Sequence, residues 1–147
     1  MTALLDTCTF IWLALDPARL SATAVSIIDD PGNDLLLSDV SVWEIVLKHA
    51  AGKLALPETP RLWVPSRRAF FRVQTLAVSE SALFRSGELP KIHADPFDRL
   101  LAAQAIEASL TMLTPDVPIE SLGAQRAWWP PGKGLVLVTP AAVSNRT

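Results

Sequence analysis

Residues 95–105 read DPFDRLLAAQA, and this stretch predicts a deeply packed helix. Asp95 stands where an N-cap is expected. Pro96 suits the first helical position because proline lacks a backbone N–H and none is needed there. The helix is expected to run from Pro96 to about Ser109. Its apolar residues cover much of its circumference, which is typical of a helix with few exposed faces. They are Leu100, Leu101, Ala103, Ala105 and Ile106.

Short apolar runs alternate with helical segments on either side of this stretch. The runs that predict strands are 2–5 (TALL), 35–38 (LLLS), 73–78 (VQTLAV) and 111–114 (TMLT). The other segments that predict helices are 9–15, 21–29, 41–52, 66–72 and 79–86. This alternation predicts an α/β protein, a three-layer sandwich in which helices flank a short, mostly parallel sheet.

Local signals place the ends of several helices. Either Asp39 or Ser41 can cap the helix that follows the second strand, and Ser41 with Glu44 has the spacing of a capping box. A Pro-rich stretch occupies 57–65, before the helix expected at 66–72. Gly87 is expected to close the helix at 79–86.

Four carboxylates stand in short apolar contexts that would hold them still. Asp6 and Asp116 follow strand-like runs, whereas Glu44 and Asp98 lie within or at the start of helical patterns. Ligands gather at the carboxyl ends of parallel strands, so we expect Asp6 and Asp116 to share one site. Acids in apolar surroundings need partners, and a divalent cation can pair with several at once. The pattern therefore predicts a metal-dependent enzyme.

The four acids, in this order, resemble those of the PIN-domain ribonucleases, and most closely the VapC-type toxins of bacterial toxin–antitoxin pairs. The matching pieces are LLDT (4–7), SVWEIVLK (41–48), DPFDRLLAAQA (95–105) and LTPD (113–116). With their spacers they span residue 1 to about 129. All four pieces in order make a specific signal, carried mostly by the second and third.

The resemblance implies an acidic cluster that binds Mg²⁺ or Mn²⁺ in an endoribonuclease. Asp6, Asp98 and Asp116 would be metal ligands, and Glu44 would complete the cluster by ligation or by orienting a water. The resemblance also implies a homodimer silenced by a small antitoxin, which would occupy an apolar groove and place a basic residue near the acids. Half of all residues are hydrophobic, which supports an apolar face for such a partner.

Two features depart from the family pattern. The family often carries a histidine after the first Asp-Thr pair, where Cys8 stands here. This departure affects a detail of the site rather than the metal cluster. The composition changes after Trp129, so we expect a nuclease domain over 1–129 and a tail over 130–147. The LVLV run at 135–138 belongs either to that tail or to an edge strand.

Asp6 and several residues near the four acids allow two interpretations each. Asp6 and Asp95 can cap helices as well as contribute to a site, and capping is the main role expected of Asp95. Arg99 contacts either a phosphate or a structural ion-pair partner. Thr114 and Ser41 can hydrogen-bond either the acids or the substrate.

The remaining polar residues of interest have ordinary structural explanations. His49 and His93 show no ligand spacing, so we expect surface or packing roles for both. The arginines at 67, 68 and 72 form either a solvated helix face, which we favour, or a guide for RNA.

Composition narrows the class of protein. A chain of 147 residues fits one domain, and its single cysteine excludes an internal disulfide and fits a reducing cytosol. The net charge of -2 gives no overall basic field. The apolar N-terminus lacks a basic region, and no apolar run approaches the roughly 20 residues of a membrane helix. We expect a soluble cytoplasmic protein.

Three other functions fit parts of this pattern. A phosphotransfer fold of the haloacid-dehalogenase type also places an aspartate after its first strand, but it needs a second one two residues later, where Cys8 stands, and a receiver domain needs an acidic pair near the N-terminus that this chain does not show. A non-catalytic binding module of the same fold and a housekeeping RNA-processing nuclease remain alternatives.

Overall fold

A six-stranded sheet in the order β3-β2-β1-β4-β5-β6 forms the centre of the computed structural model, which describes residues 1–128 and 137–138. Its strands are β1 (Thr2–Leu5), β2 (Asp34–Ser38), β3 (Val73–Leu76), β4 (Thr111–Leu113), β5 (Gln125–Ala127) and β6 (Leu137–Val138). The first five run parallel, and β6 pairs with β5 in the antiparallel sense.

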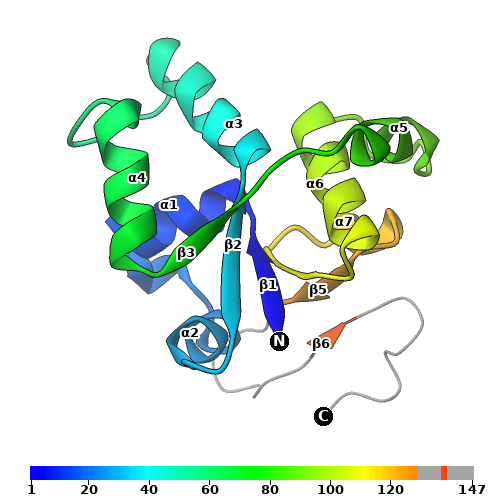
Figure 1. The fold of residues 1–147 in the computed structure, drawn as a ribbon, viewed down its shortest axis with the longest axis horizontal. Coiled ribbons are helices and arrows are strands. Elements are labelled where there is room, and N and C mark those ends of the chain that lie inside the picture. Colours follow the sequence, from blue (N-terminus) through cyan, green and yellow to red (C-terminus); the bar gives the residue numbers. More distant parts are fainter. Residues whose placement is uncertain (129–136, 139–147) are drawn as a thin grey trace.

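Helices cover both faces of this sheet (Figure 1). They are α1 (Thr7–Leu15), α2 (Ala22–Asp29), α3 (Asp39–Ala50), α4 (Pro60–Phe70), α5 (Glu80–Glu88), α6 (Pro96–Glu107) and α7 (Pro118–Ser121), with a 3-10 turn, η1 (Pro17–Arg19), after α1. Helices α1, α2 and α4 lie on one side, and α5, α6 and α7 lie on the other (Figure 1). The predicted α/β sandwich with a mostly parallel sheet is confirmed.

Two apolar clusters, one on each face, hold the layers together. Successive strand residues point to opposite faces, so Leu5 packs with Phe10 and Trp63 while its neighbour Leu4 packs with α6 through Leu101. Strands buried on both faces explain the continuous apolar runs seen in the sequence. The sheet therefore has a fixed register, which fixes the position of every residue that follows a strand.

Helix α4 differs from the prediction because it begins at Pro60 and includes most of the Pro-rich segment. Pro60 occupies a first-turn position, where proline is favoured. Pro65 lies inside the helix and donates no backbone hydrogen bond there. Trp63 and Val64 on the same turn are almost fully buried in the core. Burial of these two side chains offsets the missing hydrogen bond, so α4 begins at Pro60 rather than at the predicted residue 66.

The start of α3 also differs from the prediction. Strand β2 leads directly into α3, and Ser38 is the N-cap, with its Oγ accepting from the backbone N–H of Val40 at 3.0 Å. Ser41 therefore lies one turn inside the helix, and the capping box with Glu44 does not form. Gly87 lies within α5 rather than closing it. The caps predicted at Ser21 and Ser79 are confirmed.

The C-terminal part of the described chain adds elements that the sequence did not predict. Helix α7 and strand β5 follow β4, and Ile119 and Ala127 bury their side chains in the two clusters. For the LVLV run, residues 137–138 pair with β5 as an edge strand. The rest of the predicted tail lies outside the described residues.

Candidate metal centre

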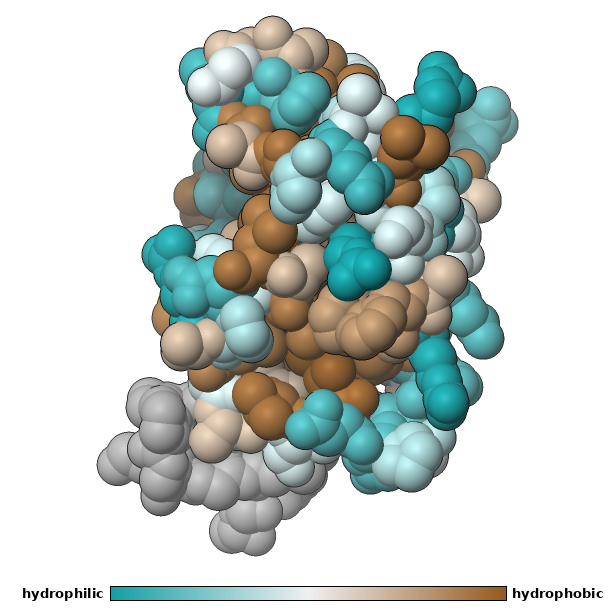
Figure 2. All heavy atoms as spheres, turned by 90° about the vertical axis from the view of Figure 1, so that its left-hand side faces the viewer, coloured by the Kyte–Doolittle hydropathy of each residue, from teal (hydrophilic) through white to brown (hydrophobic). Residues whose placement is uncertain are grey.

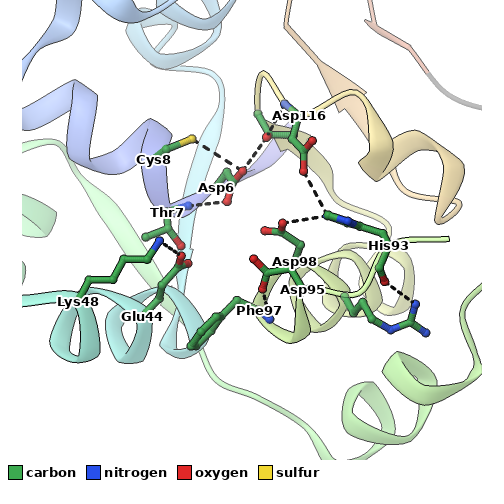
Figure 3. A network of polar contacts seen from close by, with 12 residues as sticks. Asp6, Thr7, Cys8, Glu44, Lys48, His93, Asp95, Phe97, Asp98 and Asp116 are labelled. Atoms are coloured by element: carbon green, nitrogen blue, oxygen red, sulfur yellow. Dashed lines mark hydrogen bonds and ion pairs between the residues drawn. The ribbon is translucent and has the colours of Figure 1, made fainter. Parts of the chain in front are cut away.

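The four acids predicted from the sequence lie together at the carboxyl edge of the sheet. Asp6 follows β1 directly, and Asp116 follows β4, the strand that pairs with β1 in parallel. Glu44 comes from α3 and Asp98 from the first turn of α6. Figure 3 shows these side chains facing a common space. The fold therefore brings together residues that are up to 110 positions apart in the chain.

Asp6 is a helix cap and a member of the acidic cluster at once. Its Oδ1 accepts from the backbone N–H of Thr7 at 2.7 Å, which caps α1. Its Oδ2 accepts from Oγ1 of Thr114 at 2.6 Å. The same Thr114 oxygen accepts from the backbone N–H of Asp116 at 3.0 Å. This chain of contacts holds the two strand-end acids in a fixed relation (Figure 3).

The cluster is electrostatically strained without a cation. Burial is the main cause that raises the pKa of Asp6, and the charges of Glu44 and Asp116 raise it further against hydrogen bonds that lower it. Burial, followed by the charge of Asp6, raises the pKa of Asp98 to about 7. Acids that repel one another in a buried site favour either protonation or a bound cation.

Glu44 is buried at 7% exposure and pairs with Lys48, whose Nζ lies 2.5 Å from Oε2. The hydrogen bond to Glu44 raises the pKa of Lys48. Ser41 forms no hydrogen bond with any of the four acids: it is fully buried, and its Oγ accepts from Oγ1 of Thr7 at 2.9 Å. Ser41 thus positions the start of α1 rather than a carboxylate.

His93 belongs to the cluster, although the sequence suggested only a surface or packing role. Its Nε2 lies 2.9 Å from Oδ2 of Asp98 and 3.5 Å from Oδ2 of Asp116. The sequence did contain a signal for this role. The first turn of α6 carries Asp98 at the carboxyl edge of the sheet, so the loop that leads into α6 must end at the same edge. That loop reads KIHADPFD, and His93 stands five residues before Asp98.

Arg99 forms no ion pair among the described residues, so the structural ion pair is not found, and a contact with phosphate stays a prediction. Its guanidinium donates to four backbone carbonyls at 2.7 to 3.1 Å, that of Ser86 in α5 and those of Leu89, Pro90 and His93 in the α5–α6 connection. A guanidinium has five N–H donors in a rigid fork, which suits such a set of acceptors. Arg99 therefore fixes the loop that carries His93.

Two more predicted residues lie at the margin of the cluster. Asp95 caps α6, with Oδ1 accepting from the backbone N–H of Phe97 at 2.9 Å, and it is exposed. Cys8 is half-buried, and its Sγ lies 3.9 Å from Oδ2 of Asp6. Burial and the charge of Asp6 raise the pKa of the Cys8 thiol to about 12. A neutral thiol is a poor metal ligand, so Cys8 adds no charge to the site.

The donor set fits a divalent cation. Among the described residues, His93, Asp98 and Asp116 each offer a ligand atom, and these atoms all lie within 4.8 Å of one another. Asp6 adjoins them, as its charge effect on Asp98 indicates. Carboxylate oxygens are the ligands that Mg²⁺ and Mn²⁺ favour, and imidazole nitrogen suits transition metals.

The PIN domain model matches residues 3–123 of the chain. The chain belongs to the PIN-domain family. Ribonuclease VapC16 of Mycobacterium tuberculosis is 43% identical over 53 residues, which cover 33% of this chain and 38% of that protein. The chain thus matches well under half the length of this relative.

Solved structures share this PIN-domain fold at low sequence identity. VapBC2 from Rickettsia felis, bound to a DNA fragment from its promoter, superposes with a TM-score of 0.58 at 18% identity, over 83% of this chain and 93% of the other. VapBC-1 from nontypeable Haemophilus influenzae gives a TM-score of 0.55 at 22% identity, over 81% and 90%. None of the helices within residues 1–128 combines the length and apolar character needed to cross a membrane.

Proposed function

We propose that this PIN-domain protein is a divalent-metal-dependent endoribonuclease and the toxin of a toxin–antitoxin pair. The observation that carries the proposal is the convergence of Asp6, Glu44, Asp98 and Asp116 from four separate elements at the carboxyl edge of the sheet. The partial match to a ribonuclease of the VapC type supports the choice of RNA as substrate.

The cation would be Mg²⁺ or Mn²⁺, held by Asp6, Asp98 and Asp116. When bound, such an ion lowers the pKa of a coordinated water and neutralises charge on the scissile phosphate. Without it, buried carboxylates of like charge repel the RNA backbone. The acids therefore need the cation for substrate binding as well as for hydrolysis.

The protein side chains prepare the site for this reaction. Thr114 and the N–H of Thr7 fix both oxygens of Asp6. Lys48 fixes Glu44, which is then available to orient an attacking water. These contacts are made within the protein itself, so the acids are held in position by their own neighbours.

An apolar groove supports the antitoxin part of the proposal. The groove lies between α3 and α4, has a volume of about 630 Å³, and is lined by apolar residues that include Val42, Val46, Val64 and Pro65. Figure 2 looks onto the side of the molecule that carries α4, where apolar residues form much of the surface. An antitoxin segment would lie in this groove, as apolar helices lie in apolar grooves elsewhere. A basic residue of the antitoxin would reach the acids on the other side of α3.

The homodimer and the cytoplasmic setting belong to the same proposal. Arg67 stacks its guanidinium 4.9 Å from the ring centroid of Phe70, a surface contact that agrees with the solvated helix face favoured for the arginines at 67, 68 and 72. Light scattering of the purified protein tests the homodimer.

Growth of a bacterial host tests the toxin role. Induction of the chain alone should arrest growth, and co-expression of the neighbouring reading frame should restore it. Induction of Asp6→Asn should have no effect, whereas Asp29→Asn, an exposed acid on α2, should arrest growth like the wild type. Normal growth on induction of folded wild-type protein would count against a toxin and favour a housekeeping nuclease.

A further inference from the structure

We propose that Nε2 of His93 is a direct ligand of the cation in this centre, and that it shifts the preference of the site from Mg²⁺ toward Mn²⁺ and Co²⁺. The proposal rests on the metal-dependent function proposed above. It adds a nitrogen ligand to a set that otherwise consists of carboxylates.

The spacing of the donor atoms carries the proposal. Nε2 of His93 lies 2.9 Å from Oδ2 of Asp98 and 3.5 Å from Oδ2 of Asp116. Adjacent ligand atoms around an octahedral ion with bonds of about 2.1 Å lie roughly 3 Å apart. The imidazole therefore already has about the separation from each carboxylate that adjacent ligands of one cation have, and Figure 3 shows it facing both carboxylates.

The loop that carries His93 is fixed in this position. Arg99 Nη1 donates to the backbone carbonyl of His93 at 3.0 Å and to that of Pro90 at 2.7 Å. Arg99 follows Asp98 directly on α6. The residue that holds the His93 loop and the residue that carries the carboxylate therefore lie in the same turn of one helix. The His93 side chain is 22% exposed, which leaves room for an ion to reach it from solvent.

A nitrogen ligand changes which ion binds best. Mg²⁺ prefers oxygen ligands and retains its waters, whereas affinity for nitrogen donors rises from Mn²⁺ to Co²⁺ along the transition series. A site of carboxylates alone discriminates less between these ions. The imidazole should therefore strengthen Co²⁺ and Mn²⁺ binding and have little effect on Mg²⁺.

A different role for His93 makes a different prediction. The imidazole can instead act as a positioning residue that only hydrogen-bonds to Asp98 and orients it, as groups that hydrogen-bond to metal ligands do at many metal sites. Loss of the imidazole would then weaken the binding of all three ions to a similar extent, and no bond between nitrogen and metal would exist.

Pulsed electron paramagnetic resonance of bound Mn²⁺ separates these two roles. The chain contains two histidines, so His49→Gln protein labelled with ¹⁵N-histidine carries the label at His93 alone. We expect a directly coupled ¹⁵N nucleus in that protein and none in labelled His93→Gln. Bound Mn²⁺ without ¹⁵N coupling in the His49→Gln protein would overturn the inference and leave the metal centre intact. Failure of folded wild-type protein to bind Mn²⁺ would overturn both this inference and the proposed function.

Metal affinities measured by calorimetry give a second readout. His93→Gln should raise the Kd for Co²⁺ and Mn²⁺ about tenfold or more, within the range seen when a group at a metal site is lost, and change the Kd for Mg²⁺ about threefold at most. An equal rise in the Kd for all three ions would overturn the inference in favour of the positioning role. Circular dichroism and thermal unfolding verify that each variant is folded. The labelled His49→Gln protein keeps the test valid if His93→Gln fails to fold.

Discussion

Thr114 donates a 2.6 Å hydrogen bond from Oγ1 to Oδ2 of Asp6, across 108 positions of sequence. This contact joins the ends of β1 and β4 and aims the carboxylate at the centre of the acidic cluster. Thr114 is fully buried, so its hydroxyl has no access to bulk water. The hydrogen bond links packing of the sheet to the geometry of the proposed metal site.

Thr114→Val should weaken metal binding about tenfold, as loss of a group that orients a ligand does. It should also lower the free energy of unfolding by about 1 to 3 kcal/mol, because the hydrogen bond is buried. The matched control is Thr9→Val. Thr9 is equally buried, but its Oγ1 donates to the backbone carbonyl of Leu113 at 2.7 Å. Calorimetry with Mg²⁺ and urea unfolding measure both effects, and an equal loss of affinity in the two variants would refute a specific role for Thr114.

Lys48→Met should destabilise the metal-free protein on the order of 1 kcal/mol, because Glu44 loses its partner while the apolar stem of the side chain is kept. Lys48 is half-exposed, so solvent screening keeps the effect small. Removal of a positive charge makes the cluster more negative. Saturating Mg²⁺ should therefore raise the Tm of Lys48→Met by more than that of the wild type. A smaller rise in the variant would contradict this electrostatic account.

Acidification should stabilise the metal-free protein through Asp98. The pKa of Asp98 is raised from 3.8 to about 7 in the fold, first by burial and then by the charge of Asp6. The folded protein therefore binds a proton that the unfolded chain releases at lower pH. This contribution to stability is complete below about pH 4 and is lost as the pH rises through about 7. Thermal unfolding in EDTA should show a fall in Tm between pH 5 and pH 8 that is smaller in Asp98→Asn than in Asp29→Asn. Identical slopes would show that Asp98 does not carry the effect.

Arg99→Lys should loosen the α5–α6 connection, because a single ammonium cannot replace a guanidinium that bonds four carbonyls. Hydrogen exchange should accelerate in residues 89–94 and remain unchanged in β1. Arg85→Lys is the control, since Arg85 pairs with Glu107 at the exposed surface of the same helix pair. Unchanged exchange in 89–94 would mean that other contacts hold the loop.

Much of the fold was predictable because its signals are local. The strands are continuous apolar runs, and the caps at Ser21, Ser79 and Asp95 are serine or aspartate residues directly before helical patterns. The acidic cluster was predictable for a related reason. The carboxyl ends of parallel strands share one edge of a sheet, so Asp6 and Asp116 had to meet if both strands were correct.

The features that were missed depend on tertiary packing. Nothing local indicates that Pro65 is helical, because the burial of Trp63 and Val64 decides it. Arg99 finds its acceptors in a loop whose path is set by α5 and α6 together. His93 precedes a capped helix in an irregular segment, and its approach to Asp116 requires the sheet. Side-chain partners in loops are therefore where sequence patterns carried least information.

The most direct test of the central claim is cleavage of a mixed RNA pool by the purified protein. The reaction should proceed with Mg²⁺ or Mn²⁺, stop with EDTA, and be reduced at least about 100-fold in Asp6→Asn, since a metal-ligand position is altered. Asp29→Asn should cleave at the wild-type rate. Cleavage that persists in EDTA or in folded Asp6→Asn would contradict the account, and metal binding without any cleavage would favour a non-catalytic binding module.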